Sequence, residues 1–293
     1  MEKRVIYGTT NSKLSKRCQT LYDRTLERGI FNSRCLCKGR NQTVYSHIDR
    51  IITGSATPVQ KKLELTAGDE LRAEYFLQRR ELGLINIGGK GIVYVDGKRY
   101  EVDYKEGMYI GMGSKDISFE SVNSEEPAKF YMNSAPAHTV YPTVLIKPEG
   151  VAEEGVVIVK DENKVECGSL EESNHRVLCK YILPGQVESC QLVMGMTSLK
   201  PGSVWNTMPS HTHDRRMEVY LYFDFPEDAF VMHYMGEPQE TRHIVVHNEE
   251  AVISPSWSIH SGSGSRNYTF IWGMVGENQA FDDMDGIANQ DLR

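Results

Sequence analysis

Short runs of alternating hydrophobic and polar residues dominate the chain beyond its first thirty or so residues. The runs are rich in β-branched and aromatic side chains and are separated by Gly, Pro, Asp and Asn, which is typical of antiparallel β-sandwiches and β-barrels. The clearest hairpin is IVYVDGKRYEV, residues 92–102, with Asp96 and Gly97 as its turn pair. The pattern therefore predicts an all-β fold.

Two segments break this pattern and divide the chain. Residues 1–30 carry a mixed polar and apolar pattern that is compatible with a short helix ending near Gly29. A stretch rich in Gly, Pro and acidic residues around 143–165 has the composition of a connector. We therefore expect an N-terminal helical arm over residues 1–30, one β-unit over 31–150 and a second β-unit over 151–293.

Two pairs of matching segments indicate that the second β-unit repeats the first. The run RRELGLINI from Arg79 aligns with RRMEVYLYF from Arg215, and EGMYI from Glu106 aligns with EEAVI from Glu249. Between the matched segments the second half is longer, and a lengthened loop around residues 225–228 would absorb the difference. A duplicated β-unit explains these matches.

The composition argues against several classes of protein. The chain has 293 residues, a hydrophobic fraction of 40% and a net charge of −7, so it can bury one or two cores and has no basic excess. Lys and Arg are scattered rather than clustered with aromatic residues, which argues against nucleic-acid binding. No window approaches the roughly 20 apolar residues of a membrane span, and residues 1–18 lack a signal-peptide core. We expect a soluble, intracellular protein that does not bind membranes.

The cysteines predict reduced thiols rather than a disulfide framework, because their spacing is irregular and the chain has no export signal. One C-x-C pair stands out, but no second Cys or His pair lies at zinc-finger distance from it. The positions concerned are Cys18, Cys35, Cys37, Cys167, Cys179 and Cys190.

Four potential metal ligands form the strongest chemical signal. His211 and His213 are two positions apart on a predicted strand, so their imidazoles point to the same side. Glu218 opens the run EVYLYF, and His260 ends a later strand pattern. Because the step from His213 to Glu218 breaks the alternation, a turn or bulge within residues 214–216 is required. Such a donor set suits Zn²⁺, Mn²⁺, Fe²⁺, Co²⁺ or Ni²⁺, whereas an H-x-H pair alone is also compatible with an ordinary surface.

The remaining histidines lack comparable neighbours. His243 and His247 have the spacing of a helical zinc motif, but they lie in a strand-like run, where positions four apart are too distant to chelate one ion. The others are His47, His138, His175 and His233. The repeat places poor ligands at the matching positions of the first half, which predicts one metal per chain. These positions are Tyr75, Leu77, Leu82 and Ile117.

The pattern H-x-H-x₄-E with a distant His resembles the cupin motif, whose fold is a small antiparallel barrel with a metal in its mouth. Longer stretches resemble the 5-keto 4-deoxyuronate isomerase family from about residue 40 to the end of the chain. The stretches are VYSHIDR from Val44, RRELGLINIGG from Arg79, PAHTVYP from Pro136, WNTMPSHTHDRRMEVY from Trp205 and ISPSWSIHS from Ile253.

This resemblance implies a bicupin, that is, two tandem antiparallel cupin barrels, assembled as a cytoplasmic hexamer. It implies interconversion of 4-deoxy-L-threo-5-hexosulose uronate and 3-deoxy-D-glycero-2,5-hexodiulosonate during pectin breakdown, with this keto-uronate as the small-molecule partner. It also implies one Zn²⁺ per chain. The family's ligand set carries over onto His211, His213, Glu218 and His260.

Such an isomerisation proceeds either through an enediol, with a general base that moves a proton between two neighbouring carbons, or by a hydride shift. The candidates for moving a proton are the phenols of Tyr220, Tyr222 and Tyr268, although packing is the favoured role for each of them. A guanidinium suits the substrate carboxylate, and Arg215 and Arg216 are candidates by type. Paired arginines in a loop are also compatible with simple solvation.

Two alternative functions stay open at this point. Three histidines and a glutamate also hold Fe²⁺, which would suit a cupin-type oxygenase. In a sugar-binding or storage bicupin, the metal would only stabilise the fold. Within the isomerase hypothesis, Glu218 ranks below the tyrosines as the base, because metal ligation is its simpler role.

Overall fold

The computed structural model describes residues 30–31 and 36–293. The expected helical arm over residues 1–30 lies almost entirely outside these residues, as do Cys18 and Cys35. Within the described part the fold is all-β, as expected, and its helices are single turns, none long or apolar enough to cross a membrane. These turns are η1 (Asp69–Leu71), η2 (Asp161–Asn163) and η3 (Asn289–Asp291).

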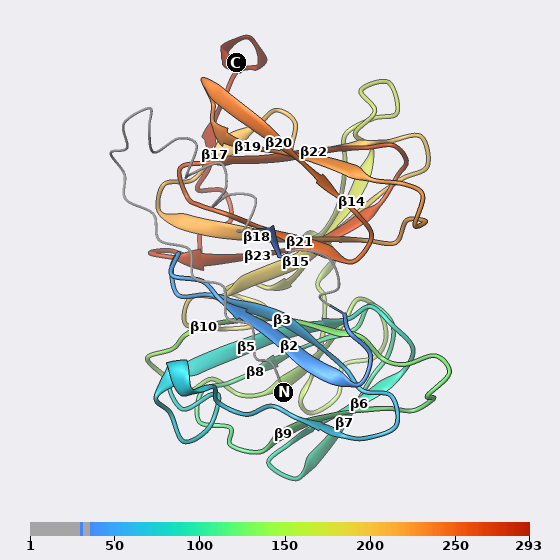
Figure 1. The fold of residues 1–293 in the computed structure, drawn as a ribbon, viewed down its shortest axis with the longest axis vertical. Coiled ribbons are helices and arrows are strands. Elements are labelled where there is room, and N and C mark those ends of the chain that lie inside the picture. Colours follow the sequence, from blue (N-terminus) through green and yellow to red (C-terminus); the bar gives the residue numbers. More distant parts are fainter. Residues whose placement is uncertain (1–29, 32–35) are drawn as a thin grey trace.

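The first unit consists of a large and a small sheet that face each other in the lower half of Figure 1. Its strands are β2 (Arg40–Tyr45), β3 (Ile52–Thr57), β4 (Leu63–Glu64), β5 (Arg80–Asn86), β6 (Gly91–Val95), β7 (Lys98–Val102), β8 (Gly107–Ile110), β9 (Ile117–Ser121), β10 (Phe130–Pro136), β11 (Val144–Lys147) and β12 (Val156–Ile158). The large sheet has the order β12-β11-β8-β5-β10-β3-β2, and the small sheet β4-β9-β6-β7. Asp96 and Gly97 have positive φ and form the expected turn between β6 and β7.

The second unit occupies the upper half of Figure 1 and is built in the same way. Its strands are β1 (Ile30–Phe31), β13 (Lys164–Cys167), β14 (Arg176–Ile182), β15 (Val193–Leu199), β16 (Trp205–Asn206), β17 (His211–Thr212), β18 (Arg216–Phe223), β19 (Val231–Glu237), β20 (Glu240–Val246), β21 (Glu250–Ser254), β22 (Ile259–Gly264), β23 (Thr269–Gly276) and β24 (Asp285–Gly286). The large sheet has the order β1-β21-β18-β23-β15-β14-β13, the small sheet β16-β22-β19-β20, and β17 pairs with β24.

The weak sequence repeat corresponds to a repeat of strand order. The series β8-β5-β10-β3-β2 matches β21-β18-β23-β15-β14, and β4-β9-β6-β7 matches β16-β22-β19-β20. The extra residues of the second unit are shared between the loop at 224–230 and the longer hairpin of β19 and β20.

The expected connector around 143–165 instead contains β11 and β12, which pair in parallel. The expected boundary at residue 150 therefore falls inside the first large sheet.

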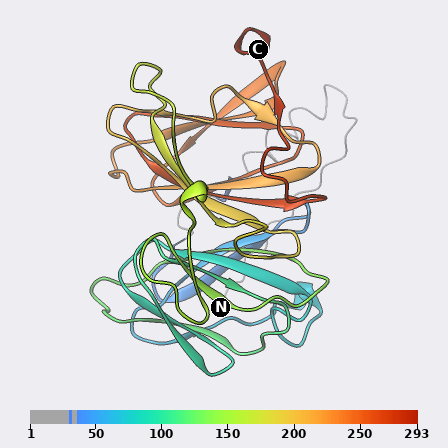
Figure 2. The ribbon, with the colours of Figure 1, turned by 180° about the vertical axis from the view of Figure 1, so that it is seen from behind.

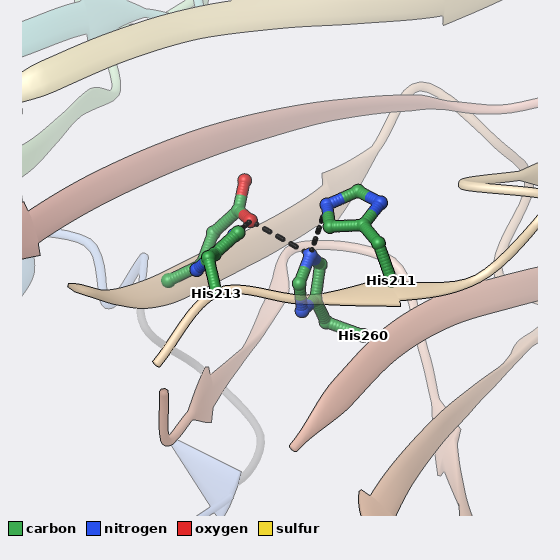
Figure 3. Close-up of side chains that lie close together, drawn as sticks. His211, His213 and His260 are labelled. Atoms are coloured by element: carbon green, nitrogen blue, oxygen red, sulfur yellow. Dashed lines mark hydrogen bonds and ion pairs between the residues drawn. The ribbon is translucent and has the colours of Figure 1, made fainter. Parts of the chain in front are cut away.

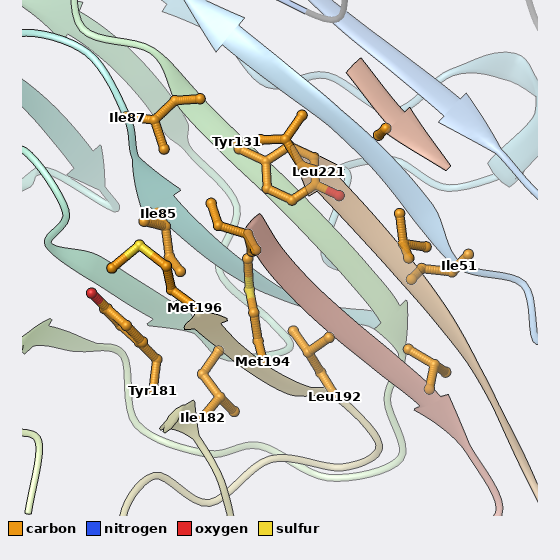
Figure 4. Packing of buried hydrophobic residues seen from close by; sticks show 14 of the residues in the cluster. Ile51, Ile85, Ile87, Tyr131, Tyr181, Ile182, Leu192, Met194, Met196 and Leu221 are labelled. Atoms are coloured by element: carbon orange, nitrogen blue, oxygen red, sulfur yellow. The ribbon is translucent and has the colours of Figure 1, made fainter. Parts of the chain in front are cut away.

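The two large sheets pack against each other through a shared apolar core (Figure 4). Ile85 and Tyr131 of the first unit belong to the same buried cluster as Met194 and Leu221 of the second. Because every residue of β18 is buried, its Val219, Leu221 and Phe223 face this core while the alternate side chains face the interior of the second unit. The strand that carries Glu218 is thus fixed on both faces.

Candidate metal centre

Three strand segments of the second unit bring the four predicted ligands together (Figure 3). His211 lies on β17, His213 directly after it, Glu218 on β18 and His260 on β22. The required turn is present at Asp214, where the backbone N–H of Arg216 donates to the carbonyl of His213. This turn restores the alternation, so that Glu218 faces the same space as the two histidines.

The distances between the donor atoms match a chelating site. Nε2 of His260 lies 3.0 Å from Nε2 of His211 and 3.0 Å from Oε2 of Glu218. Nε2 of His213 lies 3.1 Å from the same carboxylate oxygen, and all four donor atoms lie within 4.8 Å of one another. Ligands at about 2.1 Å from a tetrahedral ion are about 3.4 Å apart, which falls within the observed range.

The hydrogen bonds of the Nδ1 atoms, on the side of the rings away from the cluster, show that these residues fit a cation. Nδ1 of His213 donates to the carbonyl of Arg216 at 2.9 Å, and Nδ1 of His260 to that of Ser258 at 3.3 Å. A carbonyl only accepts, so each Nδ1 carries a proton, and in the neutral ring each Nε2 has its lone pair available for a cation. An ionised Glu218 also only accepts. A divalent metal among these atoms replaces their mutual repulsion by attraction.

Burial and mutual charge set the protonation of the centre. Burial and then the neighbouring His260 lower the pKa of His211 to about 3, so its imidazole is neutral at pH 7. Burial lowers the pKa of His213, but the hydrogen bond to Glu218 has the larger effect, so the pKa of this ring is raised overall. Burial likewise opposes ionisation of Glu218, yet the nearby histidines hold its pKa far below the usual range. Metal binding requires the neutral form of His213, so the affinity for the metal falls as the pH is lowered.

The three candidate tyrosines all face the interior of the second unit, but at different distances from the ligands. The ring of Tyr220 lies 5.6 Å from that of His260 in an edge-to-face contact, and its hydroxyl is 3.0 Å from Oγ1 of Thr207. The hydroxyl of Tyr222 lies 2.8 Å from a ring nitrogen of His233, and that of Tyr268 donates to an amide and a carbonyl oxygen. Burial raises the pKa of each phenol, so all three are neutral at pH 7.

His233 is a buried residue of this interior to which the sequence assigned no role. It lies on β19 between Val231 and Met235, which point to the same face and are also buried. Burial and then the charge of His260 lower its pKa to about 3, so it is a neutral partner of Tyr222. Its position at an inward place of an alternating strand is the signal that would have found it.

The paired arginines are occupied by residues near the end of the chain. The guanidinium of Arg215 pairs with Asp283 and Asp285. That of Arg216 is buried and donates to the carbonyls of Ala280, Phe281 and Asp283. A role of either arginine toward a substrate carboxylate stays a prediction.

The first unit has an apolar core at the positions that match the ligands. Leu77, Leu82 and Ile117 are buried in the cluster inside this unit, and Tyr75 is partly buried. Among the residues that the structure describes, the group of His, Cys, Asp and Glu with metal-binding geometry is the one in the second unit.

A repeated all-β architecture with a buried centre of three histidines and one glutamate defines a cupin-like protein with a candidate metal site. Within this class, the chain belongs to the KduI/IolB family, whose profile matches residues 31–288. The family resemblance inferred from the sequence is thereby confirmed.

Relatives of high identity cover most of the chain. One from Lachnoclostridium phytofermentans is 74% identical over 250 residues, 85% of this chain and 87% of that protein. One from Lachnospira eligens is 62% identical over the same shares of the two chains. Both are named 4-deoxy-L-threo-5-hexosulose-uronate ketol-isomerase. The homologues are thus ketol-isomerases by name, an intramolecular class of oxidoreductase.

Solved structures of low identity share the fold. An IolB-like protein from Salmonella typhimurium has a TM-score of 0.66 at 14% identity and covers 87% of this chain and 95% of its own. The oxalate decarboxylase of Bacillus subtilis, which has Mn(II) centres, has a TM-score of 0.52 at 8% identity and covers 81% of this chain and 71% of its own. At such identities the likeness concerns the fold alone.

Proposed function

We propose that the protein is a metal-dependent ketol-isomerase that interconverts 4-deoxy-L-threo-5-hexosulose uronate and 3-deoxy-D-glycero-2,5-hexodiulosonate in pectin and uronate breakdown. The observation that carries the proposal is the buried centre of His211, His213, Glu218 and His260, in a chain 74% identical to a protein named for this activity. We propose Zn²⁺ as the metal, at one ion per chain, because the family resemblance implies it and the donor set is compatible with it.

The proposal extends to the architecture and the assembly. The repeated strand order supports two tandem cupin-type barrels that meet between β12 and β13 rather than at residue 150, with the first barrel free of metal. A hexameric assembly and a cytoplasmic location, which the family resemblance implies, stay predictions.

The residues around the centre supply orientation and protection for the isomerisation. The reaction moves a hydrogen from C2 to C1 and the hydroxyl proton from O2 to O1 while the carbonyl moves from C1 to C2, and a divalent metal held by the four ligands would stabilise the charge that develops on the two oxygens. The carbonyls of Arg216 and Ser258 hold the rings of His213 and His260 in one tautomer. The burial of both rings and of Glu218 keeps bulk water from the reacting atoms.

Replacing Tyr220 by phenylalanine is expected to lower kcat by about 10²- to 10⁴-fold, the range of a lost general acid or base. Tyr220 is the candidate phenol whose ring contacts a ligand ring, and the metal content should stay that of the parent protein. Tyr268→Phe is the matched control, because it removes an equally buried phenol that bonds to Asn206 instead. Equal kcat values for the two variants would contradict this role for Tyr220.

The proposal is tested by elemental analysis of the purified protein together with conversion of the keto-uronate before and after chelation. We expect close to one zinc per chain, loss of turnover on chelation and its return when zinc is added. Bound iron with oxygen uptake would favour the oxygenase. Bound metal without turnover, combined with a lower melting temperature after chelation, would favour the binding module.

A further inference from the structure

The last described segment, residues 277–293, runs along one side of the second unit, and we call it the strap (Figure 2). Its strand β24 pairs antiparallel with β17, so that Gly286 lies opposite the ligand His211. The backbone N–H of Ile287 donates to the carbonyl of Ser210 at 2.8 Å, and that of Glu277 to the carbonyl of Arg215 at 2.8 Å. The strap therefore holds both ends of the segment that carries His211 and His213.

Strand β17 depends on this contact. In the described part of the chain, β24 is the strand to which β17 is hydrogen-bonded, and the pair stands apart from the large and small sheets. Glu218 and His260, in contrast, lie on β18 and β22, each inside a sheet with a neighbour on both sides. Among the ligand-bearing strands, β17 is thus the one that takes its main-chain pairing from the strap.

Arg216 links the strap to the second histidine. Its buried guanidinium donates to three carbonyls of the strap, those of Ala280, Phe281 and Asp283. Its own carbonyl accepts the hydrogen bond from Nδ1 of His213. A displacement of the strap is therefore transmitted through one residue to the ring of a ligand.

Arg215 binds the strap on its solvent-exposed side. Its Nε and Nη2 form a bidentate pair with the carboxylate of Asp283 at 2.8 and 2.6 Å, and Nη2 also lies 2.8 Å from Asp285. Asn278 donates to the same carboxylate of Asp283 at 2.6 Å. An isolated exposed ion pair contributes little, but a bidentate network of this kind fixes geometry.

The strap also has an apolar anchor, because Phe281 packs against the buried cluster inside the second unit, with its ring 5.5 Å from that of Trp272. A surface cavity of about 470 Å³ borders the strap and is lined by its Ile287 together with Thr212 and Trp257. Beyond the cavity, the main-chain oxygen of Arg293 accepts from the backbone and hydroxyl of Thr241. The strap is thus anchored at its end and clamped by Arg215 and Arg216 where it passes the ligands.

We propose that Arg215 and Arg216 are positioning residues that act through the strap to hold His211 and His213 at a spacing that binds the metal. The inference rests on the proposed metal-dependent function. It also accounts for the arginine pair that follows the ligand pair in the sequence, because both side chains are bound to the strap.

The test compares zinc affinity with stability in Arg215→Gln and Arg216→Lys. Zinc affinity is measured by competition with a chromophoric chelator, and stability by urea unfolding of the metal-free protein. Loss of a group that orients metal ligands weakens binding by about 10- to 100-fold. We expect a loss in this range for both variants, with the urea midpoint of Arg215→Gln equal to that of the parent. The matched control is Arg99→Gln, an exposed arginine paired with Glu101 in the first unit, which should bind zinc like the parent.

Other outcomes separate this inference from the proposed function. Parent-like zinc affinity in both variants would overturn the role of the strap. A raised KM for the keto-uronate with unchanged zinc affinity would overturn it too, and would assign the arginines to the substrate carboxylate. A parent protein that binds no zinc would instead overturn the metal-dependent function on which the inference rests.

Discussion

Replacement of Glu218 by glutamine is expected to weaken zinc binding by more than about 100-fold, beyond the cost of losing a group that merely orients a ligand. The amide keeps the size of the side chain but removes the charge that lies 3.0 and 3.1 Å from two imidazole nitrogens. Since the three histidines are neutral when they bind, this carboxylate is the anionic ligand of the centre. Turnover should fall with the bound metal. Elemental analysis after dialysis and initial rates in added zinc measure the two effects.

The matched control for this substitution is Glu120→Gln in the first unit. Glu120 is a partly buried glutamate whose carboxylate accepts a hydrogen bond from Tyr94, and its replacement should leave metal content and turnover at parental levels. Full zinc content without turnover in Glu218→Gln would move Glu218 from ligand to general base. Full zinc content with full turnover would refute the ligand assignment.

The part of the centre that the sequence predicts is the part governed by strand periodicity. Alternation places His211 and His213 on one side, and separates Glu218, Tyr220 and Tyr222 from the apolar residues between them. The break in alternation before Glu218 predicts a turn or bulge within residues 214–216, and the structure has a turn there. Local rules of this kind hold because the strand is buried on both faces, so each side chain has one suitable environment.

The remaining features depend on contacts between distant segments without periodicity. The polar stretch around residues 277–293 has no hydrophobic alternation, and its pairing with β17 is a matter of main-chain hydrogen bonds. A guanidinium suits a substrate carboxylate as well as a carboxylate or carbonyl of the protein, so the sequence could not show that Arg215 and Arg216 contact residues 277–293. The sequence did not predict the parallel pair β11 and β12, because both strands are short and are bounded by Gly and Pro, which are typical of a connector.

The interface between the two units contains a buried carboxylate, and its loss is expected to have the largest effect on the free energy of unfolding. Glu81 of β5 is fully buried and accepts hydrogen bonds from the hydroxyl of Tyr109 and from three consecutive backbone N–H groups of the second unit. These donors belong to Cys190, Gln191 and Leu192, at 2.6 to 2.8 Å. Hydrogen bonds to a charged group are stronger than neutral ones, and a buried donor left unpaired costs about 1–3 kcal/mol.

Glu81→Leu is therefore expected to lower the free energy of unfolding by about 3–5 kcal/mol, the range for breaking a buried charged network. Leucine fills a similar volume but leaves the N–H groups of residues 190–192 without an acceptor. Urea unfolding followed by tryptophan fluorescence measures the loss. In Glu101→Gln, an exposed glutamate paired with Lys90 and Arg99, the change should stay within about 0.5 kcal/mol. If Glu81→Leu unfolds at the same urea concentration as this control, the carboxylate does not hold the two units together.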